Sequence, residues 1–406
     1  MSKEHHLNES KVFCMFPWMH LNVTPKGDIY PCCSNNYSTP YGNTKEITLE
    51  KAFNLPEMKE LRLNMLNDKP SKICEFCYKH EEAGPHSFRN YSKDHFAKYY
   101  DELIPMTQED GTVDDFKMRY FDIRFSNICN FKCRTCGAEF SSKWAQENRH
   151  WDKNHPIIMH ADDNKGKLLE EVLTHIDHID LAYFAGGEPL ITEEHYVMLE
   201  EMIRRGKTNI TLRYNTNASN IKYKNHDVLS LWKHFDKVEL SCSIDHYGER
   251  AEWIRSGTDW GVVETNLLTF RTLKYVSFQI NTVFSIFNYL TLPEFYTYMK
   301  DRGLIQSNDW YNSLYLAVHP KHYSAKSLPK ELKNIARNKA NKFCEGNGQG
   351  YQGLTKLVRD AVNFADESDT WAENKEEFFK HTLSLDRLRE ESFFNTFPEL
   401  ARLPIL

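Results

Sequence analysis

The sequence predicts an α/β fold whose core is a partial barrel of six parallel strands. Short β-rich runs recur between residues 118 and 320 with helical patterns between them, as in repeated βα units. The six runs are Arg119–Phe125, Asp180–Phe184, Ile210–Tyr214, Val238–Cys242, Phe278–Phe284 and Leu314–Val318. Apolar residues three and four apart predict outer helices at Lys167–His175, His195–Arg205 and Val262–Leu273.

We expect four regions along the 406 residues. They are a small cysteine-rich β-hairpin and helix domain at 1–90, a linker at 91–117, the barrel at 118–320 and a helical C-terminal extension at 321–406. The glycine-rich stretch at 346–353 lacks the lysine and hydroxyl residue of a phosphate loop, so we interpret it as a linker.

Composition narrows the class of protein. The formal charge of −6 comes from interspersed acidic and basic residues, without the basic stripe of a nucleic-acid binder, so nucleic acid is unsupported as a partner. No apolar run approaches the roughly 18 residues that span a bilayer, and no secretory segment opens the chain, so we expect a cytoplasmic protein without a membrane partner. Eight of the ten cysteines precede residue 137, and in a reducing compartment this clustering favours metal ligation over disulfides.

The first cysteine set surrounds a predicted β-hairpin. Alternating residues at His20–Val23 and Asp28–Tyr30 flank a Pro-Lys-Gly turn, and apolar spacing predicts a helix over Leu49–Asn67. The thiolates that can converge are those of Cys14, one of Cys32 and Cys33, Cys74 and Cys77. Because neighbouring strand residues face opposite sides, only one of the adjacent pair can face the site, and we favour Cys32. Four ligands close a site, which zinc or an iron-sulfur cluster can occupy.

The second cysteine set is open. Cys129, Cys133 and Cys136 are spaced by three and then two residues, which gathers three thiolates in one short loop. A closed tetrahedral or cubane site needs four ligands, so one metal position remains for a small molecule that coordinates and reacts. A zinc site completed by a distant residue is the alternative.

Polar groups follow the predicted strands at their carboxyl ends, where barrels of this type bind ligands. The first strand runs into Cys129, the second ends in Ala185-Gly-Gly-Glu-Pro189, the third in Asn215-Thr-Asn217 and the fourth in Ser241-Cys-Ser-Ile-Asp245. Two residues without Cβ let the backbone approach a ligand, and the carboxylate of Glu188 suits an ammonium group.

The three-cysteine loop resembles the CxxxCxxC motif of the radical S-adenosylmethionine (radical SAM) superfamily, and the Gly-Gly-Glu-Pro run resembles its GGEP motif. The resemblance implies a [4Fe-4S] cluster on three cysteines, S-adenosylmethionine on its fourth iron, and reductive cleavage to methionine and a 5′-deoxyadenosyl radical. Thr135 stands where the family often has an aromatic residue, which is not a cluster ligand.

The first cysteine set resembles the twitch module, the shortened relative of the SPASM domain, which holds an auxiliary [4Fe-4S] cluster. Related enzymes usually carry this module after the barrel, whereas here it comes first. With the core motifs, the resemblance covers roughly residues 11 to 320.

The resemblance also assigns cofactor contacts. The residues that it implies are Gly186, Gly187 and Glu188 for the amino group of S-adenosylmethionine, Asn215 and Asn217 for its ribose, and Ser243 and Arg255 for its carboxylate. His246 replaces the family's usual glycine, which makes the register less certain. For Arg255 a helix-surface ion pair is the alternative, and asparagines after a strand are also ordinary turn residues.

The sequence therefore predicts a radical SAM enzyme that abstracts a substrate hydrogen atom with an auxiliary cluster assisting. Peptide or protein modification is the first expectation, and oxidation of a carbohydrate-like small molecule is the second. Such an enzyme needs an electron donor such as flavodoxin or ferredoxin. A non-catalytic zinc or iron-sulfur binding protein is the hypothesis of another class, and no residue is assigned as general acid or base.

Overall fold

The computed structural model describes residues 1–35, 37, 39–82, 86–163, 166–307, 313–347, 350–400 and 403. The chain is a mixed α/β protein that divides into two compact units. The first unit comprises residues 1–128, 158–213 and 229–237, and the second comprises 129–157, 214–228 and 238–406. Each unit collects several stretches of chain, and the boundaries expected from the sequence stay predictions.

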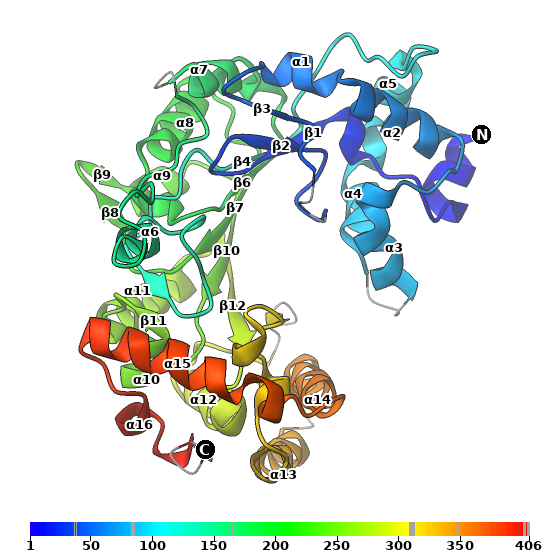
Figure 1. Cartoon of the computed structure of the whole chain (residues 1–406). Coiled ribbons are helices and arrows are strands. Elements are labelled where there is room, and N and C mark those ends of the chain that lie inside the picture. The colour runs from blue at the N-terminus through cyan, green and yellow to red at the C-terminus, as the bar shows by residue number, and fades with distance from the viewer. Residues whose placement is uncertain are drawn as a thin grey trace. The chain divides into compact units, whose positions relative to one another are not determined.

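The first unit contains a sheet with strand order β6-β4-β1-β2-β3. Its strands are β1 (His20–Val23), β2 (Asp28–Tyr30), β3 (Gly42–Asn43), β4 (Tyr120–Ile123) and β6 (Leu181–Phe184). The predicted hairpin is confirmed as the antiparallel pair β1 and β2. The sequence did not indicate that β1 also pairs in parallel with β4, with Asn22 opposite Asp122 (Figure 1). The N-terminal hairpin is therefore an extension of the sheet that leads to the three-cysteine loop.

Helices complete the first unit. They are α1 (Leu49–Phe53), α2 (Pro56–Leu66), α3 (Glu75–Glu82), α4 (Phe88–Phe96), α5 (Tyr100–Leu103), α7 (Lys167–Thr174) and α8 (Glu193–Arg204). The single helix expected at Leu49–Asn67 is wrong, because the chain breaks at Asn54 and Leu55. Pro56 has no N–H to continue the first helix and instead starts the second one, where no donor is needed.

A buried arginine fixes α2 in place. The guanidinium of Arg62 donates to the carbonyls of Pro17 (2.8 Å), Gly111 (3.0 Å) and Phe53 (2.5 Å). Its burial lowers the pKa of Arg62 to about 9. These bonds tie α2 to the segment just after Cys14, which matters because α2 forms one wall of the cysteine pocket described below.

The second unit contains the parallel strands β10 (Lys237–Ser243), β12 (Val276–Phe284) and β13 (Ser313–Leu316) in that order. The short strands β5 (Lys132–Cys133) and β11 (Arg255–Ser256) form a separate antiparallel pair, as do β8 (Lys222–Tyr223) and β9 (His226–Asp227). Strand β7 (Thr211–Thr216) and helix α9 (Val228–Trp232) include residues of both units. All six predicted β-rich runs therefore contain a strand.

The helices of the second unit are α6 (Ser142–Asn148), α10 (Gly248–Ile254), α11 (Trp260–Thr272), α12 (Leu292–Asp301), α13 (Lys330–Gly346), α14 (Gln352–Asp366), α15 (Trp371–Arg389) and α16 (Phe393–Thr396). Helices α13 and α14 lie side by side (Figure 1). The linker expected at 346–353 falls largely between them, and its residues 348 and 349 lie outside the described ones.

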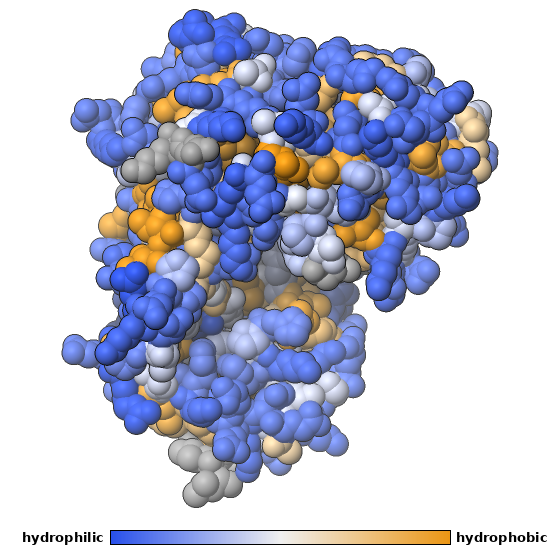
Figure 2. All heavy atoms as spheres, turned by 45° about the horizontal axis from the view of Figure 1, so that its top comes forward, coloured by the Kyte–Doolittle hydropathy of each residue, from blue (hydrophilic) through white to orange (hydrophobic). Residues whose placement is uncertain are grey.

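The surface is polar. Figure 2 shows a face covered mainly by hydrophilic residues, with hydrophobic side chains in small groups. Within the described residues, we find no helix long and apolar enough to cross a membrane.

Candidate functional site

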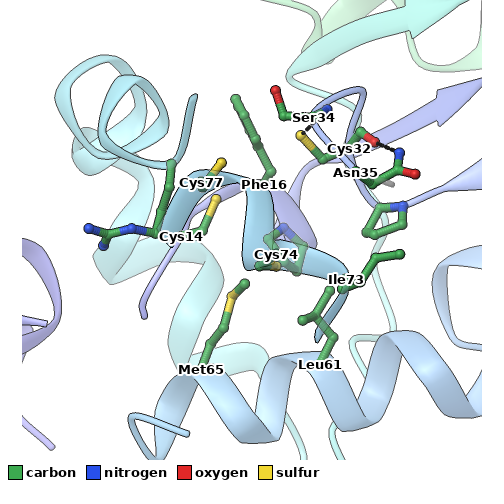
Figure 3. Close-up of a pocket in the computed structure, with 13 residues that line it drawn as sticks. Cys14, Phe16, Cys32, Ser34, Asn35, Leu61, Met65, Ile73, Cys74 and Cys77 are labelled. Carbon is green, nitrogen blue, oxygen red and sulfur yellow. Dashed lines mark hydrogen bonds between the residues drawn. The ribbon is translucent and has the colours of Figure 1, made fainter. Parts of the chain in front are cut away.

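Four cysteines line one pocket in the first unit. Cys14 precedes the turn at Phe16–Trp18, Cys32 follows β2, Cys74 ends a short 3-10 helix and Cys77 lies in α3 (Figure 3). A cavity of about 30 Å³ lies between them, and apolar side chains supply most of its remaining walls. These apolar residues are Phe16, Pro17, Pro31, Leu61, Met65 and Ile73.

Burial keeps the pocket thiols neutral. It raises the pKa of Cys14 to about 11, although a hydrogen bond with Ser92 (3.1 Å) opposes the change. Burial also raises the pKa of Cys74 and Cys77. Thiolates in this pocket therefore require a positive partner, and metal ions are what deprotonate buried cysteines in proteins.

Of the two adjacent cysteines, Cys32 is the one among the described residues that line the pocket. Cys32 lines the pocket, and its Sγ accepts a hydrogen bond from the Ser34 backbone N–H at 3.3 Å (Figure 3). Asn35 donates to the Cys32 carbonyl and so fixes the turn. Cys33 is not part of the described lining, although its side chain is hydrogen-bonded to that of Cys32. The structure thus places Cys32 with Cys14, Cys74 and Cys77, as the sequence predicts.

The three-cysteine loop lies in the second unit. Cys133 is buried, Cys129 is half-buried and Cys136 is exposed. Trp144 of α6 donates its indole N–H to the Cys133 carbonyl (2.6 Å), and the Ser142 hydroxyl accepts from the Cys129 N–H (3.2 Å). Helix α6 therefore holds the loop from one side, while the exposed edge at Cys136 stays accessible.

A buried arginine within the loop anchors it to the C-terminal helix. Arg134 is 1% exposed, and its guanidinium donates to Asp386 of α15 (2.6 Å) and to Glu391 (2.5 Å). The same group lies over the Trp253 ring at 3.4 Å from the ring centroid. The helical extension is therefore a support for the cysteine loop.

A second ion pair reinforces this support. Arg389, near the end of α15, donates three bonds to the Glu147 carboxylate, of 3.0, 3.2 and 2.6 Å, and Lys132 donates to the same carboxylate at 2.8 Å. Burial disfavours the Glu147 anion, but these two cations keep the pKa of Glu147 below its ordinary value. Local sequence signals gave no hint of partners so far apart.

The Gly-Gly-Glu-Pro turn lies in the first unit, and its glycines are required by close packing. A Cβ on Gly187 would lie 2.0 Å from the Ile128 carbonyl oxygen, and Gly186 has a φ of 122°. The Glu188 N–H donates to the same carbonyl at 2.8 Å, and the Glu188 carboxylate accepts from the Leu190 N–H at 3.2 Å. The turn is thus pressed against Ile128, the residue before Cys129.

Other predicted cofactor residues meet in the second unit. Asn217, Ser243 and Arg255 line one pocket with Phe131, Asp245, His246 and Trp260, among others. Asn217 donates to the side-chain oxygen of Asn130, inside the cysteine loop, at 2.9 Å. Asn215 is not part of the described lining of this pocket. The structure therefore gathers three of the predicted contacts beside the loop.

His246, which replaces the family's glycine, is a neutral packing residue. Its Nδ1 accepts from the Tyr247 N–H (2.9 Å), so Nε2 carries the proton and donates to the Thr291 hydroxyl (3.1 Å). Burial lowers the pKa of His246 to about 3. Sequence reasoning missed its neighbour Asp245, whose signal was its place at the end of β10.

The described residues hold no group of three or more His, Cys, Asp or Glu side chains close enough together to bind a single metal ion. The residues present still fit the expected groups on two counts. Four thiols line one pocket, and three further cysteines lie in one short loop whose edge at Cys136 is exposed.

Residues 14–78 match the family model SPASM, which describes an iron-sulfur cluster-binding domain. The prediction of a SPASM-like cluster domain is confirmed. The matched segment begins at Cys14 and contains the whole tetrad. The match places these four cysteines in an iron-sulfur cluster-binding domain, whereas the three-cysteine loop lies outside the matched residues.

Three solved structures illustrate the likeness. Native anSMEcpe with bound AdoMet and Cp18Cys peptide is 19% identical, with 55% of this chain and 58% of that chain covered and a TM-score of 0.38. SuiB of Streptococcus suis bound to precursor peptide SuiA is 14% identical, with 61% and 54% covered and a TM-score of 0.32. Another crystal structure of Streptococcus suis SuiB is 13% identical, with 80% of this chain and 68% of that chain covered and a TM-score of 0.34.

The chain thus spans 58% of the anSMEcpe chain and 54% of the peptide-bound SuiB chain. Overlaps at such TM-scores carry no argument about the chemistry of this chain. Among curated proteins, none matches it.

Proposed function

We propose that this chain is a radical SAM enzyme that modifies a peptide or protein. The observation that carries the proposal is the presence of two cysteine sets with different numbers of ligands. The SPASM segment supplies four thiols around one pocket, whereas the second set supplies three in one loop. A protein that only needed structural metal would have no use for an incomplete second site.

Each set has its own role in this proposal. Cys129, Cys133 and Cys136 hold the cluster that S-adenosylmethionine completes, and Cys14, Cys32, Cys74 and Cys77 hold the auxiliary cluster. When bound, the reduced cluster and S-adenosylmethionine supply the 5′-deoxyadenosyl radical that abstracts a substrate hydrogen atom. The strands of residues 118–320 form the partial barrel around this chemistry.

The chain's own residues position the cofactor. Gly186, Gly187 and Glu188 receive its amino group, Asn215 and Asn217 its ribose, and Ser243 its carboxylate side. The Trp144 and Arg134 contacts hold the loop in one conformation, which is what a reaction at an open metal position needs. An external one-electron donor of the flavodoxin or ferredoxin type reduces the cluster.

Peptides are the first substrate class to test, because peptide and protein modification is what the SPASM resemblance implies. The anSMEcpe and SuiB structures described above contain a bound peptide. Oxidation of a carbohydrate-like small molecule is the second class, and deuterated candidates scored by label transfer into 5′-deoxyadenosine separate the two.

Anaerobic reconstitution tests the proposal. We expect about eight irons with matching sulfide per chain, as two four-iron clusters require, and release of 5′-deoxyadenosine from S-adenosylmethionine under a strong reductant. Zinc in both sites without 5′-deoxyadenosine would show instead a non-catalytic metal protein.

A further inference from the structure

Arg255 stands directly opposite a cluster cysteine. Strand β11 runs antiparallel to β5, with Arg255 paired to Cys133 and Ser256 paired to Lys132. A backbone bond from the Arg134 N–H to the Ile254 carbonyl (2.8 Å) secures the same register. Directly opposed residues of an antiparallel pair present their side chains on one face, so this pairing brings the guanidinium to the thiol.

All three guanidinium nitrogens of Arg255 are engaged. Nη1 donates to Cys133 Sγ at 3.7 Å, Nη2 donates to Asp245 Oδ1 at 3.3 Å, and Nε lies 2.9 Å from Asp245 Oδ2. The resemblance assigns Arg255 to the carboxylate of S-adenosylmethionine. In the structure, the guanidinium of Arg255 instead contacts the Asp245 carboxylate and the Cys133 thiol.

Asp245 is itself held rigidly. The residue is fully buried, its Oδ1 accepts from the Val283 N–H at 2.7 Å, and its backbone carbonyl accepts from the Asn288 amide at 3.1 Å. Both partners belong to β12 or the turn after it. The chain Asp245, Arg255, Cys133 therefore has the form of an outer-shell carboxylate that orients a cation against a metal ligand.

The cation is permanent. An arginine guanidinium stays charged at any pH at which a protein is folded, and here it lies between the Asp245 carboxylate and the Cys133 sulfur. Reduction of a cluster adds one electron, and part of that negative charge lies on the ligating sulfurs. A fixed positive charge and an N–H donor at one sulfur stabilise the reduced state more than the oxidised state.

We propose that Arg255 is a redox-tuning positioning residue, fixed by Asp245, which raises the reduction potential of the cluster held by Cys129, Cys133 and Cys136. The inference rests on the proposed function, since it requires a cluster on this loop. It changes the role of Arg255 from a cofactor contact to a residue that acts through Cys133. The effect eases one-electron reduction by a biological donor.

The test is an EPR-monitored redox titration of the reconstituted full chain without S-adenosylmethionine. The signal that belongs to the loop is the one that changes when the cofactor is later added. We expect Arg255→Gln to shift its midpoint to more negative potential and Arg255→Lys to shift it less, because lysine keeps the charge but not the fork. Arg250→Gln, which removes an arginine of α10 that pairs with Glu399, is the matched control and should leave the midpoint in place.

Binding of S-adenosylmethionine separates the two roles. On our proposal its Kd changes little in Arg255→Lys, whereas a carboxylate-binding arginine would lose at least about tenfold. An unchanged midpoint with weakened cofactor binding overturns the proposal. If Arg255→Gln fails to take up iron, Arg255→Lys and Asp245→Asn carry the test, and a wild-type midpoint in both overturns it as well. A wild-type chain without a loop cluster refutes the proposed function itself.

Discussion

The two cysteine sets differ in how the chain builds them. The four pocket cysteines come from separate parts of the segment between residues 14 and 77 and lie among apolar side chains, whereas the other three cysteines lie in one short segment with an exposed edge at Cys136. The cations differ as well. Arg89, beside the tetrad, donates hydrogen bonds to Glu81 and to two backbone carbonyls, whereas Arg255 donates one to the sulfur of Cys133.

On the proposed function, the closed set of four cysteines holds an auxiliary cluster and the open set of three holds the cluster that reacts. A buried site with four ligands protects a cluster from solvent and from other ligands. An open loop held by Trp144, Arg255 and the bond from its own Arg134 to Asp386 leaves a position for a small molecule without losing its shape. The experiments below are ordered from the largest expected effect to the smallest.

Removing a ligand from either set should have unequal consequences. Cys133→Ala should eliminate 5′-deoxyadenosine release, a loss beyond the ~100-fold typical of an outer-shell change, because the open site loses a ligand. Cys74→Ala should retain measurable cleavage, since the tetrad is not the site of S-adenosylmethionine. Product quantification under a chemical reductant checks both variants, and equal loss would contradict the division of roles.

The adjacent cysteines allow a matched comparison inside the tetrad. Cys32→Ala should reduce the iron content of the auxiliary site, because Cys32 lines the pocket. Cys33→Ala should leave about eight irons per chain, as expected for two four-iron clusters. Iron and sulfide analysis decides, and the reverse outcome would assign the ligand to Cys33.

Arg134 anchors the loop to Asp386 and Glu391. Arg134→Met removes the cation that balances the Asp386 and Glu391 carboxylates, so we expect a loss of about 3–5 kcal/mol in the free energy of unfolding. Arg387 is an exposed residue of α15, the helix that contains Asp386. Arg387→Gln should therefore change the free energy of unfolding by less than about 0.5 kcal/mol. Chemical denaturation of the two apo variants gives both values, and a similar loss in both would refute the anchoring role.

The glycine turn can be tested by one methyl group. In Gly187→Ala the new Cβ meets the Ile128 carbonyl, so the turn must shift, with a cost of about 1–3 kcal/mol and weaker S-adenosylmethionine binding. Gly261→Ala in α11 meets nothing closer than 3.4 Å and serves as the control. Denaturation midpoints and equilibrium binding measure the two effects, and unchanged binding in Gly187→Ala would remove the turn from the cofactor site.

The burial of His246 predicts a smaller effect, on how the free energy of unfolding depends on pH. Its folded-state pKa of about 3 lies below the value of 6.5 expected unfolded, so the unfolded chain binds the extra proton as the pH falls. The contribution of His246 to the free energy of unfolding is therefore full above pH 6.5 and falls as the pH drops, by about 1.5 kcal/mol between pH 6.5 and 5. Wild type should therefore lose more free energy of unfolding over this range than His246→Gln, and parallel curves would refute a buried neutral histidine.

Much of the fold was accessible from local patterns. The six β-rich runs became strands and the hairpin at His20–Tyr30 formed where alternation placed it, because burial on a pleated surface leaves a local pattern. The break at Pro56 was also a local signal, but it was overlooked. The pairing of β1 with β4 leaves no local signal in the sequence, because the register between distant strands is set by the whole fold.

The candidate site divides in the same way. Cysteine spacing identified the ligand sets, and the glycine turn was visible as a motif. The anchor between Arg134 and Asp386 joins residues 252 positions apart, and the contact of Arg255 with Cys133 spans 122, so neither could be read from neighbouring residues. The sequence thus predicts which groups can bind a metal, while the structure shows which side chains contact those groups.

Electron-nuclear double resonance with S-adenosylmethionine carrying ¹⁵N in its amino group tests the central claim most directly. In reduced, reconstituted protein we expect a ¹⁵N coupling in wild type and in Cys32→Ala, and none in Cys133→Ala, because the cofactor completes the cluster of the three-cysteine loop. A coupling that persists in Cys133→Ala and vanishes in Cys32→Ala would place the cofactor on the tetrad and contradict the account.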